Sequence, residues 1–302
     1  MSERKIELSI IVISYNTKTI TQNCLDSIVK SLKKSQMHYE IIMVDNASTD
    51  GSQDQISKFK SQNHNLNLKT LFNKKNVGFA KANNQAAKVA EGEYILFLNS
   101  DVLVLEDAIE KLLTFYKQRE NTINFLGGKL LNKNLTSQPS CGPFYSLSVI
   151  FAALFLRGDY WSLTRYSPAI TREVDWISGA CILTKNHYFS ELGGFDENIF
   201  MYMDEIDLLY RAKKRGFRVF FYPEARFIHL GSASSQGRTY PILQVYRGFI
   251  FFYKKHYSQQ KLYILKIMLQ LKALVGIFLG RVLNNYYLTN TYEEAFKIAQ
   301  MA

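Results

Sequence analysis

The sequence has few cysteines and no early glycine. Its three cysteines, Cys24, Cys141 and Cys181, lie far apart and lack the spacing of a metal site. They argue against a disulfide framework and favour a reducing compartment. The first glycine of the 302 residues is Gly51, so the glycine-rich turn that follows the first strand of a nucleotide-dependent dehydrogenase is missing. A sugar nucleotidyltransferase would also place a glycine-rich loop there, and that class is disfavoured on the same ground.

Long apolar runs and acidic residues are also scarce. No stretch of 18 or more uncharged apolar residues occurs, and the N-terminal apolar run is short, so we expect neither a clear transmembrane helix nor a secretion signal. The chain has 37 basic and 26 acidic residues, a formal charge of +11. This excess favours an anionic partner, namely a phosphorylated small molecule, acidic lipid or nucleic acid. We expect a cytoplasmic protein.

Short apolar runs alternate with segments of helical period over the first 130 residues. Strands are expected at 6–15, 39–44, 67–72, 94–98 and 123–131, and helices at 19–34, after residue 52, at 79–90 and at 106–118. Such alternation predicts an α/β sheet with helices on both faces. Ligands of these sheets bind beyond the carboxyl ends of the strands, so polar residues just after strands are the first candidates for a site.

The second half of the sequence is less regular. Residues 141–170 are rich in apolar side chains and predict either a core helix or an apolar surface element. A strand over 174–185, a helix from about Asp204 and a strand over 218–230 follow, and Pro223 within the last strand suggests an edge position or a bend. Beyond about Tyr240 the chain is expected to be helical.

Two polar motifs of the first half each allow a structural and a functional interpretation. Asp45 follows the run "YEIIMV" and is either a turn residue or an acceptor for a nucleobase or ribose. In "NVGFAKANNQA", Asn76 and Gly78 precede a helix whose first turns carry Lys81. A helix start of this kind suits a diphosphate, but it also describes an ordinary capped surface helix.

Three later motifs contain carboxylates or histidine. Asp101, in Asn99-Ser100-Asp101, is either a cap residue or one oxygen ligand of Mg²⁺ or Mn²⁺. The stretch "MYMDEIDLLYR" crowds carboxylates at a helix start, where they complement the helix dipole or supply a general base. Asp207 and Arg211 are four residues apart and predict an ordinary ion pair. His229 follows a strand and is either a structural residue or a metal ligand.

The order of these motifs closely resembles the family 2 glycosyltransferases over about residues 6–235. The matching segments run from "SIIVISYN" through "VDNASTDGS" and "YILFLNSDV" to "MYMDEIDLL" and "ARFIHLGS". The resemblance implies a GT-A fold and an inverting, rhamnosyltransferase-like enzyme of bacterial surface-polysaccharide synthesis. It also implies two parts, a catalytic domain over 1–240 and an amphipathic helical extension over 241–302. Within the catalytic domain, nucleotide-sugar binding falls in about 1–130 and the acceptor side in about 131–240.

The resemblance also assigns roles to residues. It implies a nucleotide pocket formed by Ser14, Tyr15, Asn16, Asp45, Asn76, Gly78, Lys81, Asn99 and Ser100. It implies that Asp101 and His229 bind a divalent metal, Mg²⁺ or Mn²⁺, that holds the diphosphate. Asn99 stands where a stricter version of the motif has a first Asp, which puts strict metal dependence in question.

The base of the family is the second acid of a Glu-Asp-like pair, and the matching position is Glu205, with Asp204 as the second candidate. Trp176 and Gly179 match the acceptor wall, although a buried core Trp is the simpler interpretation. The resemblance points to a dTDP- or UDP-sugar donor, first of all dTDP-rhamnose, and to a saccharide or polyprenyl-linked acceptor. The alternative is a non-catalytic relative that binds a nucleotide sugar or scaffolds a membrane assembly. A nucleic-acid partner would not explain the acidic cluster.

The C-terminal extension mixes aromatic, aliphatic and basic residues. Lys266, Lys272 and Arg281 argue against a simple membrane span. We therefore expect an interfacial helix that lies on anionic lipid at the inner face of the plasma membrane, helped by Lys254, Lys255 and Lys261 and by the apolar segment 141–156. The alternative is a helix packed on the catalytic domain or on a partner subunit, and a homo-oligomer is left open.

Overall fold

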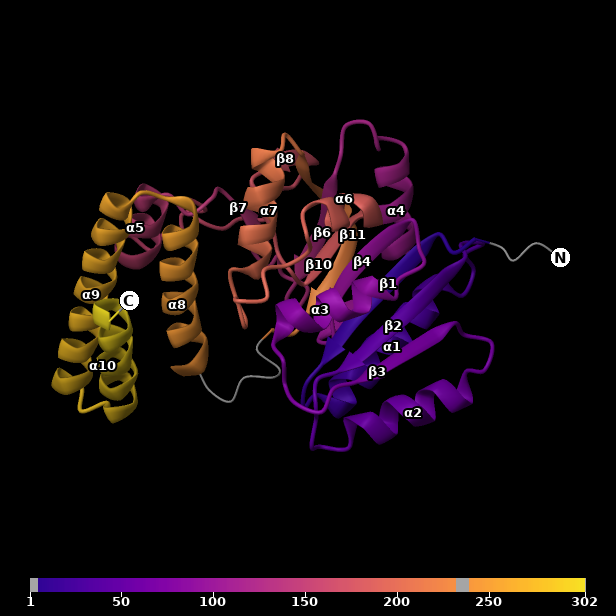
Figure 1. Cartoon of the computed structure of the whole chain (residues 1–302), viewed down its shortest axis with the longest axis horizontal. Coiled ribbons are helices and arrows are strands. Elements are labelled where there is room, and N and C mark those ends of the chain that lie inside the picture. Colours follow the sequence, from indigo (N-terminus) through magenta and orange to yellow (C-terminus); the bar gives the residue numbers. More distant parts are fainter. Residues whose placement is uncertain (1–4, 232–238, 302) are drawn as a thin grey trace.

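The computed structural model describes residues 5–231 and 239–301. A twisted sheet with helices on both faces forms most of the molecule, and the last three helices stand together at one end of it (Figure 1). The α/β architecture predicted from the sequence is therefore confirmed.

The main sheet has nine strands in the order β3-β2-β1-β4-β10-β6-β11-β5, with β8 paired to β11. Its strands are β1 (Leu8–Ser14), β2 (Tyr39–Asp45), β3 (Leu68–Phe72), β4 (Tyr94–Asn99), β5 (Val102–Val104), β6 (Phe125–Leu131), β8 (Arg172–Val174), β10 (Cys181–Lys185) and β11 (Val219–His229). A small second sheet pairs β7 (Cys141–Gly142) with β9 (Trp176–Ile177). The helices are α1 (Lys18–Leu32), α2 (Ser52–Gln62), α3 (Phe79–Lys88), α4 (Ala108–Lys117), α5 (Leu147–Phe155), α6 (Asn186–Glu191), α7 (Asp204–Lys214), α8 (Thr239–His256), α9 (Gln259–Val282) and α10 (Tyr286–Met301).

Strand β1 shows why the sheet is covered on both faces. Successive side chains of a strand point to opposite faces, and in β1 both sets are apolar and buried. Ile10 and Val12 join the apolar cluster that contains Cys24 and Leu25 of α1, whereas Ile11 joins the cluster on the other side. A strand that is apolar on both faces needs a helical layer on each, as is usual for parallel sheets.

The register of the parallel strands aligns their carboxyl ends. Ser14 of β1 lies opposite Asp45 of β2, and Ile13 of β1 lies opposite Asn99 of β4. Beyond Asn99 the chain turns and returns as β5, whose Val102 pairs with His229 at the end of β11. This pairing brings Asp101 next to His229, which is 128 residues later in the chain. The pairing of β5 with β11 was not predicted from strand periodicity.

Two later expectations change in detail. The strand expected over 174–185 is three short strands, because Asp175 leaves the sheet to accept a hydrogen bond from the Phe144 backbone and Ser178 begins a turn that ends at Cys181. The strands β5 and β7 and the helix α6 were not anticipated. Pro223 lies within β11, in the interior of the sheet, and the pairing of β11 with β6 shifts register between Tyr222 and Arg226. The bend interpretation of Pro223 is therefore confirmed and the edge interpretation is wrong.

The C-terminal helices form beyond residue 239, as expected. Helix α8 is part of the main core, since Leu243, Tyr246 and Phe249 belong to the same buried cluster as the sheet residues. Helix α10 approaches α9 closely at Gly276, where an added Cβ would lie 2.4 Å from the Tyr292 ring. The division of the chain at residue 240 stays a prediction.

One described helix, α9, is long and apolar enough by length and composition to cross a membrane, with a mean hydropathy of 1.9 in its most apolar window. It meets this description although Lys266 and Lys272 interrupt its apolar run. One third of that window is buried against the rest of the protein. A helix that packs on its own protein and crosses no membrane can have the same length and composition.

Candidate active site

A cleft of about 510 Å³ opens at the carboxyl ends of β4 and β11. Asn99, Ser100 and Asp101 from the β4–β5 turn line it together with His229. Gly179, Asp204 and Glu205 also line this cleft. It thus brings together seven of the residues predicted from the sequence, contributed by four separate segments of the chain.

Asp101 and His229 form the pair predicted to bind a metal. The His229 Nε2 atom lies 3.3 Å from Asp101 Oδ1. The His229 Nδ1 atom lies 2.7 Å from the carbonyl oxygen of Gln138, and the amide nitrogen of Gln138 donates to the His229 backbone carbonyl. When Nδ1–H donates its hydrogen bond to the Gln138 side-chain oxygen, Nε2 faces Asp101 and can bind a cation, the second-shell arrangement common around histidine ligands.

The donor set of this pair fits a divalent cation only in part. Within residues 5–231 and 239–301, no three His, Cys, Asp or Glu side chains gather in a way that could hold an ion. Asp101 and His229 would supply one oxygen and one nitrogen, and Mg²⁺ or Mn²⁺ needs about six ligands. The remaining ligands would have to come from water and from diphosphate oxygens of a bound ligand.

Asn99 and Ser100 complete the β4–β5 turn. The side-chain oxygen of Asn99 is buried and has no hydrogen-bond partner among the described residues. A buried acceptor without a donor costs free energy, and here it belongs to a residue that lines the cleft, where a ligand hydroxyl would satisfy it. The Ser100 hydroxyl lies 3.4 Å from that of Thr17, which in turn bonds to Ser14.

Asp45 is fully buried at the end of β2 and is not among the residues that line the cleft. One carboxylate oxygen accepts hydrogen bonds from the Ser48 backbone and from the Gln53 amide, at 2.9 and 2.8 Å. The other oxygen is buried without a partner among the described residues. The turn interpretation is thus correct for one oxygen, and the other remains available to a ligand that reaches this end of β2.

The other residues predicted for the nucleotide pocket surround the loop after β2. Asn16 has a positive φ of 53° and connects to this loop through the Ser48 hydroxyl and the Thr49 backbone amide. The Ser14 hydroxyl bonds to those of Thr17 and Thr21 and is buried. Tyr15, between them, is half-buried. These contacts fix the conformation of the chain at the end of β1.

Asn76, Gly78 and Lys81 lie at the start of α3. The Asn76 carbonyl oxygen accepts from the Asn46 amide and from the Gly78 backbone. Gly78 has a φ of 86°, and an added Cβ would lie 2.7 Å from the Phe200 carbonyl oxygen, so this position requires glycine. Lys81 pairs with Glu197 at 3.3 Å and does not line the cleft. The structure therefore gives Lys81 a surface ion pair, and its predicted diphosphate role stays a prediction.

Asp204 and Glu205 are the first two residues of α7, and both line the same cleft as Asp101. Asp204 is 3% exposed, and Glu205 is half-buried. Burial raises the pKa of both carboxyl groups, and the neighbouring Glu205 charge raises that of Asp204 further, well above its usual range. At neutral pH, negative charge is therefore held more readily by Glu205 than by Asp204.

The two residues before α7 have an uncommon backbone conformation. Tyr202 and Met203 have φ angles of 63° and 70°, a left-handed conformation that costs about 1 kcal/mol for each non-glycine residue. Helix α8 holds this segment in place, since an added Cβ at Gly248 would lie 2.7 Å from Met203 Cγ. The strained turn aims the first residues of α7 at the cleft.

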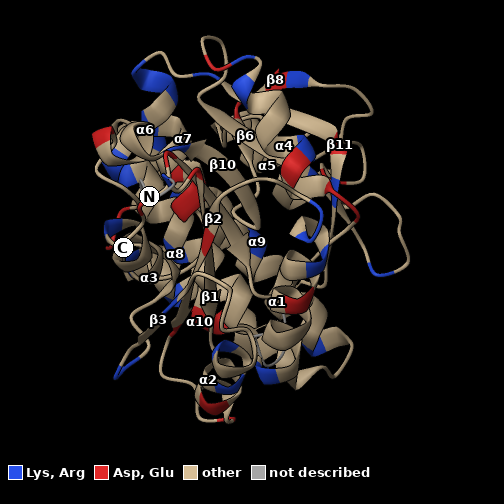
Figure 2. Cartoon of the chain, turned by 90° about the vertical axis from the view of Figure 1, so that its right-hand side faces the viewer, with Lys and Arg blue, Asp and Glu red and all other residues tan. Residues whose placement is uncertain are grey.

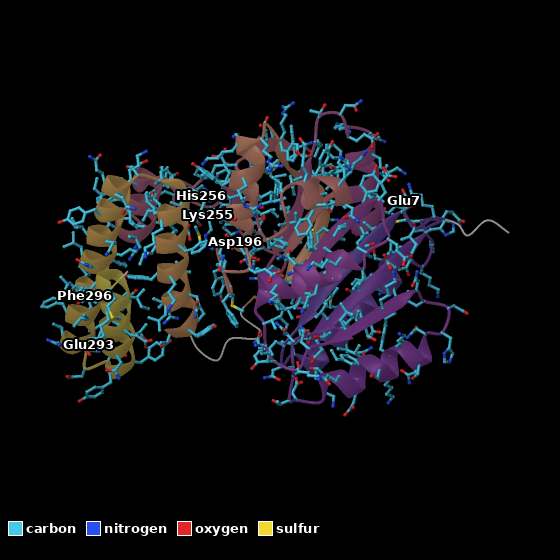
Figure 3. The ribbon with its side chains drawn as sticks, viewed as in Figure 1. Glu7, Asp196, Lys255, His256, Glu293 and Phe296 are labelled. Atoms are coloured by element: carbon cyan, nitrogen blue, oxygen red, sulfur yellow. The ribbon has the colours of Figure 1, made fainter. Side chains whose placement is uncertain are left out.

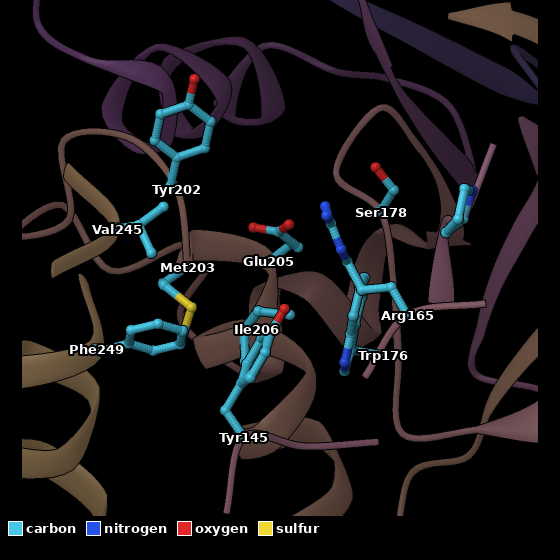
Figure 4. A pocket seen from close by; sticks show the side chains of 11 residues that line it. Tyr145, Arg165, Trp176, Ser178, Tyr202, Met203, Glu205, Ile206, Val245 and Phe249 are labelled. Atoms are coloured by element: carbon cyan, nitrogen blue, oxygen red, sulfur yellow. The ribbon is translucent and has the colours of Figure 1, made fainter. Parts of the chain in front are cut away.

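A second, smaller cavity of about 150 Å³ adjoins Glu205. Figure 4 shows Glu205 and Arg165 beside it, with Tyr145, Trp176 and Phe249 among the apolar residues that line it. Trp176 is 3% exposed, and its indole N–H donates to the Pro143 carbonyl. The core interpretation of this Trp is therefore confirmed, and its predicted place in the acceptor wall stays a prediction.

Several residues of the site were missed from the sequence. Gln138 and Arg165 belong to the segment between β6 and β8, and both line the main cleft. The Arg165 Nε donates to Asp159 at 2.9 Å, and this contact raises the pKa of the guanidinium further above its usual range. For Arg165, its place as a polar residue within the apolar segment 141–170 was the available signal, but one sequence does not say which way such a side chain points.

Asp207, one turn along α7, connects the site to the C-terminal helices. It bonds to Arg211 Nε at 2.7 Å, to His256 Nε2 at 2.7 Å and to Lys255 Nζ at 2.8 Å. Figure 3 places Lys255 and His256, from the end of α8, beside Asp196 and the α7 region. The predicted Asp207–Arg211 pair is confirmed. Although burial opposes ionisation, the hydrogen bond from His256 and the positive charge of Arg211 lower the Asp207 pKa to about 2.

Comparisons with known proteins agree with this geometry. Residues 9–144 match the family described as Glycosyl transferase family 2. Over these 136 of its 302 residues, the chain is similar to glycosyl transferase family 2. Among its relatives, N-acetylglucosaminyl-diphospho-decaprenol L-rhamnosyltransferase of Mycobacterium tuberculosis is 28% identical over 220 residues, which are 66% of this chain and 68% of that protein. Rhamnosyltransferase WbbL of Escherichia coli K12 is 26% identical over 69% of this chain and 79% of its own length.

Another relative, the putative teichuronic acid biosynthesis glycosyltransferase TuaG of Bacillus subtilis, is 32% identical over 136 residues. Those residues are 45% of this chain, and the match spans about half, 52%, of TuaG.

Solved structures show the same fold. The mannosyltransferase PcManGT of Pyrobaculum calidifontis, solved with GDP-Man and Mn²⁺, has a TM-score of 0.59 over 98% of this chain and 75% of that one, at 17% identity. Residues 1–349 of Staphylococcus aureus TarS, solved with UDP-GlcNAc, have a TM-score of 0.56 over 97% and 92%, at 15% identity. The expected GT-A fold is thereby confirmed.

Proposed function

We propose that this cleft transfers a sugar from a nucleotide diphosphate sugar to an acceptor hydroxyl with inversion at the anomeric carbon. The observation that carries the proposal is the placement of two acidic centres on one cleft. The Asp101–His229 pair lies at the end of β4, and Asp204 and Glu205 lie at the start of α7. An inverting transfer needs one group at the leaving diphosphate and a base near the attacking hydroxyl.

Glu205 is the better candidate for the base. It faces both the main cleft and the smaller cavity, whereas Asp204 lines the main cleft alone. Its pKa is raised by burial, which makes its carboxylate a stronger base, and the pKa of Asp204 is raised further. In the proposed reaction, Glu205 takes the proton of the acceptor hydroxyl while the hydroxyl oxygen bonds to the anomeric carbon. The bond from that carbon to the diphosphate oxygen breaks in the same step.

The leaving diphosphate would lie at Asp101. When bound with it, a divalent cation would stabilise the charge that develops on the diphosphate. Asp101 and His229 would be the protein ligands, and Gln138 would keep the His229 proton on Nδ1. Arg165, which is paired with Asp159, lies in the same cleft and could donate a hydrogen bond to the diphosphate.

The donor and acceptor follow from the relatives only as proposals. Two relatives are named rhamnosyltransferases, and the name of one contains a diphospho-decaprenol. We therefore propose a deoxysugar donor, first of all dTDP-rhamnose, and a saccharide or polyprenyl-diphosphate-linked acceptor in bacterial surface-polysaccharide synthesis.

Substitution of Glu205 tests the base. Glu205→Gln should lower transfer from dTDP-rhamnose to a polyprenyl-linked acceptor by about 100-fold or more, because general-base catalysis contributes about 10²–10⁴. The matched variant Asp204→Asn should retain more transfer than Glu205→Gln. Thermal stabilisation by dTDP reports whether each variant still binds nucleotide. Unchanged transfer by Glu205→Gln would contradict this assignment, and a wild-type protein that binds dTDP but never transfers would favour the non-catalytic scaffold.

A further inference from the structure

Helix α9 has an apolar face on each side, and only one of them is packed. Leu262, Leu265, Leu269 and Ala273 point inward and are buried against neighbouring helices. The outward face consists of Ile264, Ile267, Leu271, Leu274, Val275 and Phe278, which are 39–66% exposed. In a protein surrounded by water, a contiguous exposed apolar face of this length marks an interaction site.

Basic residues border this outward face on both sides. At about 100° per residue, the six apolar side chains fall within an arc of about 100°, with Lys261 and Lys272 along one edge and Arg281 along the other. Helix α9 contains four basic residues and no Asp or Glu. The sequence has no acidic residue between Glu224 and Glu293. By contrast, helices that cover the sheet, such as α1, α2 and α4, carry charges of both signs (Figure 2).

We propose that the outward face of α9 docks on the surface of an anionic lipid bilayer, with the helix lying along the membrane. The apolar arc would enter the acyl boundary while the long Lys and Arg side chains reach the headgroups. A second copy of the chain fits less well, because each copy would bring the same positive charge and no acidic residue of α9 to the contact. This inference adds a membrane partner to the proposed function, and lipid binding can be measured without any transfer reaction.

The start of α9 is fixed to the catalytic helix, which favours lying on the membrane over crossing it. His256 bonds to Asp207 of α7, and Ser258 caps α9 by accepting a hydrogen bond from the Lys261 backbone. Only two residues separate the end of α8 from the start of α9. A bilayer-crossing α9 would have to leave its packing on α8 and α10 and would place Lys266 and Lys272 in the hydrocarbon region.

Helix α5 and the loop after it also expose aromatic residues. Helix α5 packs against α9 and exposes Phe151, and the loop after α5 exposes Tyr160 and Trp161 at 77% and 65%. Trp and Tyr are enriched where proteins meet the membrane–water boundary. The structure modifies the sequence prediction in one respect: Lys255, expected to contact lipid, instead pairs with Asp196 and Asp207.

Vesicle flotation of the full chain tests this inference. We expect the wild type to float with phosphatidylcholine vesicles that contain about 30% phosphatidylglycerol, and to float less without the anionic lipid or at about 1 M salt, where charges are screened. The double variant Leu271→Glu, Phe278→Glu should lower the bound fraction about tenfold or more. Leu135→Glu, at an exposed apolar position far from α9 in sequence, is the matched control and should float like the wild type.

Three results would overturn the inference. The first is no flotation of the wild type, and the second is flotation that the double variant does not reduce. The third is membrane binding that resists carbonate extraction, since that would indicate a spanning helix. A dimer in solution that the double variant dissociates, without flotation of the wild type, would assign the face to a second copy instead. Stabilisation by dTDP in every variant would show that the fold is intact and would separate a failure of docking from a failure of the proposed function.

Discussion

Apolar side chains are buried differently in two regions of the molecule. One is the N-terminal sheet region, which comprises β1 to β4 with α1 to α3, and the other consists of the C-terminal helices α8 to α10. In the sheet region, both faces of β1 are covered, and polar groups gather at the carboxyl ends of the strands. In the C-terminal helices, α9 buries one apolar face and exposes another. The difference shows that the sheet region is covered on both faces and ends in a polar site, whereas the C-terminal helices leave one apolar face of α9 uncovered by the described residues.

Asp207 of α7 joins the C-terminal helices to the rest of the molecule, and its removal should have the largest effect on stability. Asp207→Ala leaves Arg211, Lys255 and His256 without their shared carboxylate. Breaking a buried ion pair from one side costs about 3–5 kcal/mol, and the free energy of unfolding from urea titration should fall by that amount. Asp207→Asn, which keeps the shape, is the control for lost packing. An unchanged free energy of unfolding in Asp207→Ala would show that this carboxylate does not join the C-terminal helices to the rest of the molecule.

The same carboxylate should also make stability depend on pH. Its pKa is lowered from 3.8 to about 2 in the folded protein, so its stabilisation is present above about pH 4 and is lost as the pH falls towards 2. The gap in melting temperature between wild type and Asp207→Asn should therefore narrow on acidification over this window. A gap that stays constant from pH 5 to pH 2 would contradict the assignment.

Disturbing the α9–α10 contact should have a moderate effect, confined to the C-terminal helices. Gly276→Val places a side chain against the Tyr292 ring, and overpacking of this kind costs about 1–3 kcal/mol. Leu271→Ala, on the outward face of the same helix, should change stability by less than about 0.5 kcal/mol. Nucleotide stabilisation should persist in both variants. Its loss in Gly276→Val would show that the C-terminal helices and the cleft are not separable.

The smallest effect is expected at the strained start of α7. Asp204 has a raised pKa because its carboxyl is buried beside Glu205. The protonated Asp204 therefore stabilises the fold at low pH, and this stabilisation is lost as the pH rises above 3.8, the pKa of an ordinary Asp, towards the raised pKa of the folded protein. Asp204→Asn cannot ionise and should melt a few degrees higher than the wild type at pH 7, with no difference at low pH. A lower melting temperature at pH 7 would mean that the ionised Asp204 stabilises the fold.

Much of the sheet region was predictable from the sequence because its signals are local. Apolar runs such as that of β4 end at polar residues, and the parallel register then brings Ser14, Asp45 and Asn99 to one edge. The Asp101–His229 pair came only from the resemblance to a family, because the pairing of β5 with β11 joins segments far apart in the chain.

The rest depended on which way side chains point. One sequence does not predict the hydrogen bond between Gln138 and His229 or the ion pair between Lys255 and Asp207. Each contact joins a polar side chain to an element far away in the chain. For α9, hydropathy gave an apolar helix but could not distinguish its packed face from its exposed one, because both faces carry leucine.

The central claim is that Asp101 belongs to a site for a nucleotide diphosphate, and nucleotide-dependent thermal stabilisation tests it most directly. The melting temperature would be measured with dTDP, UDP and GDP, each with and without Mn²⁺ or Mg²⁺, for the wild type and for Asp101→Ala. We expect stabilisation by a pyrimidine diphosphate that is strengthened by the cation and is lost in Asp101→Ala. No stabilisation by any nucleotide, or equal stabilisation in both proteins, would contradict the claim.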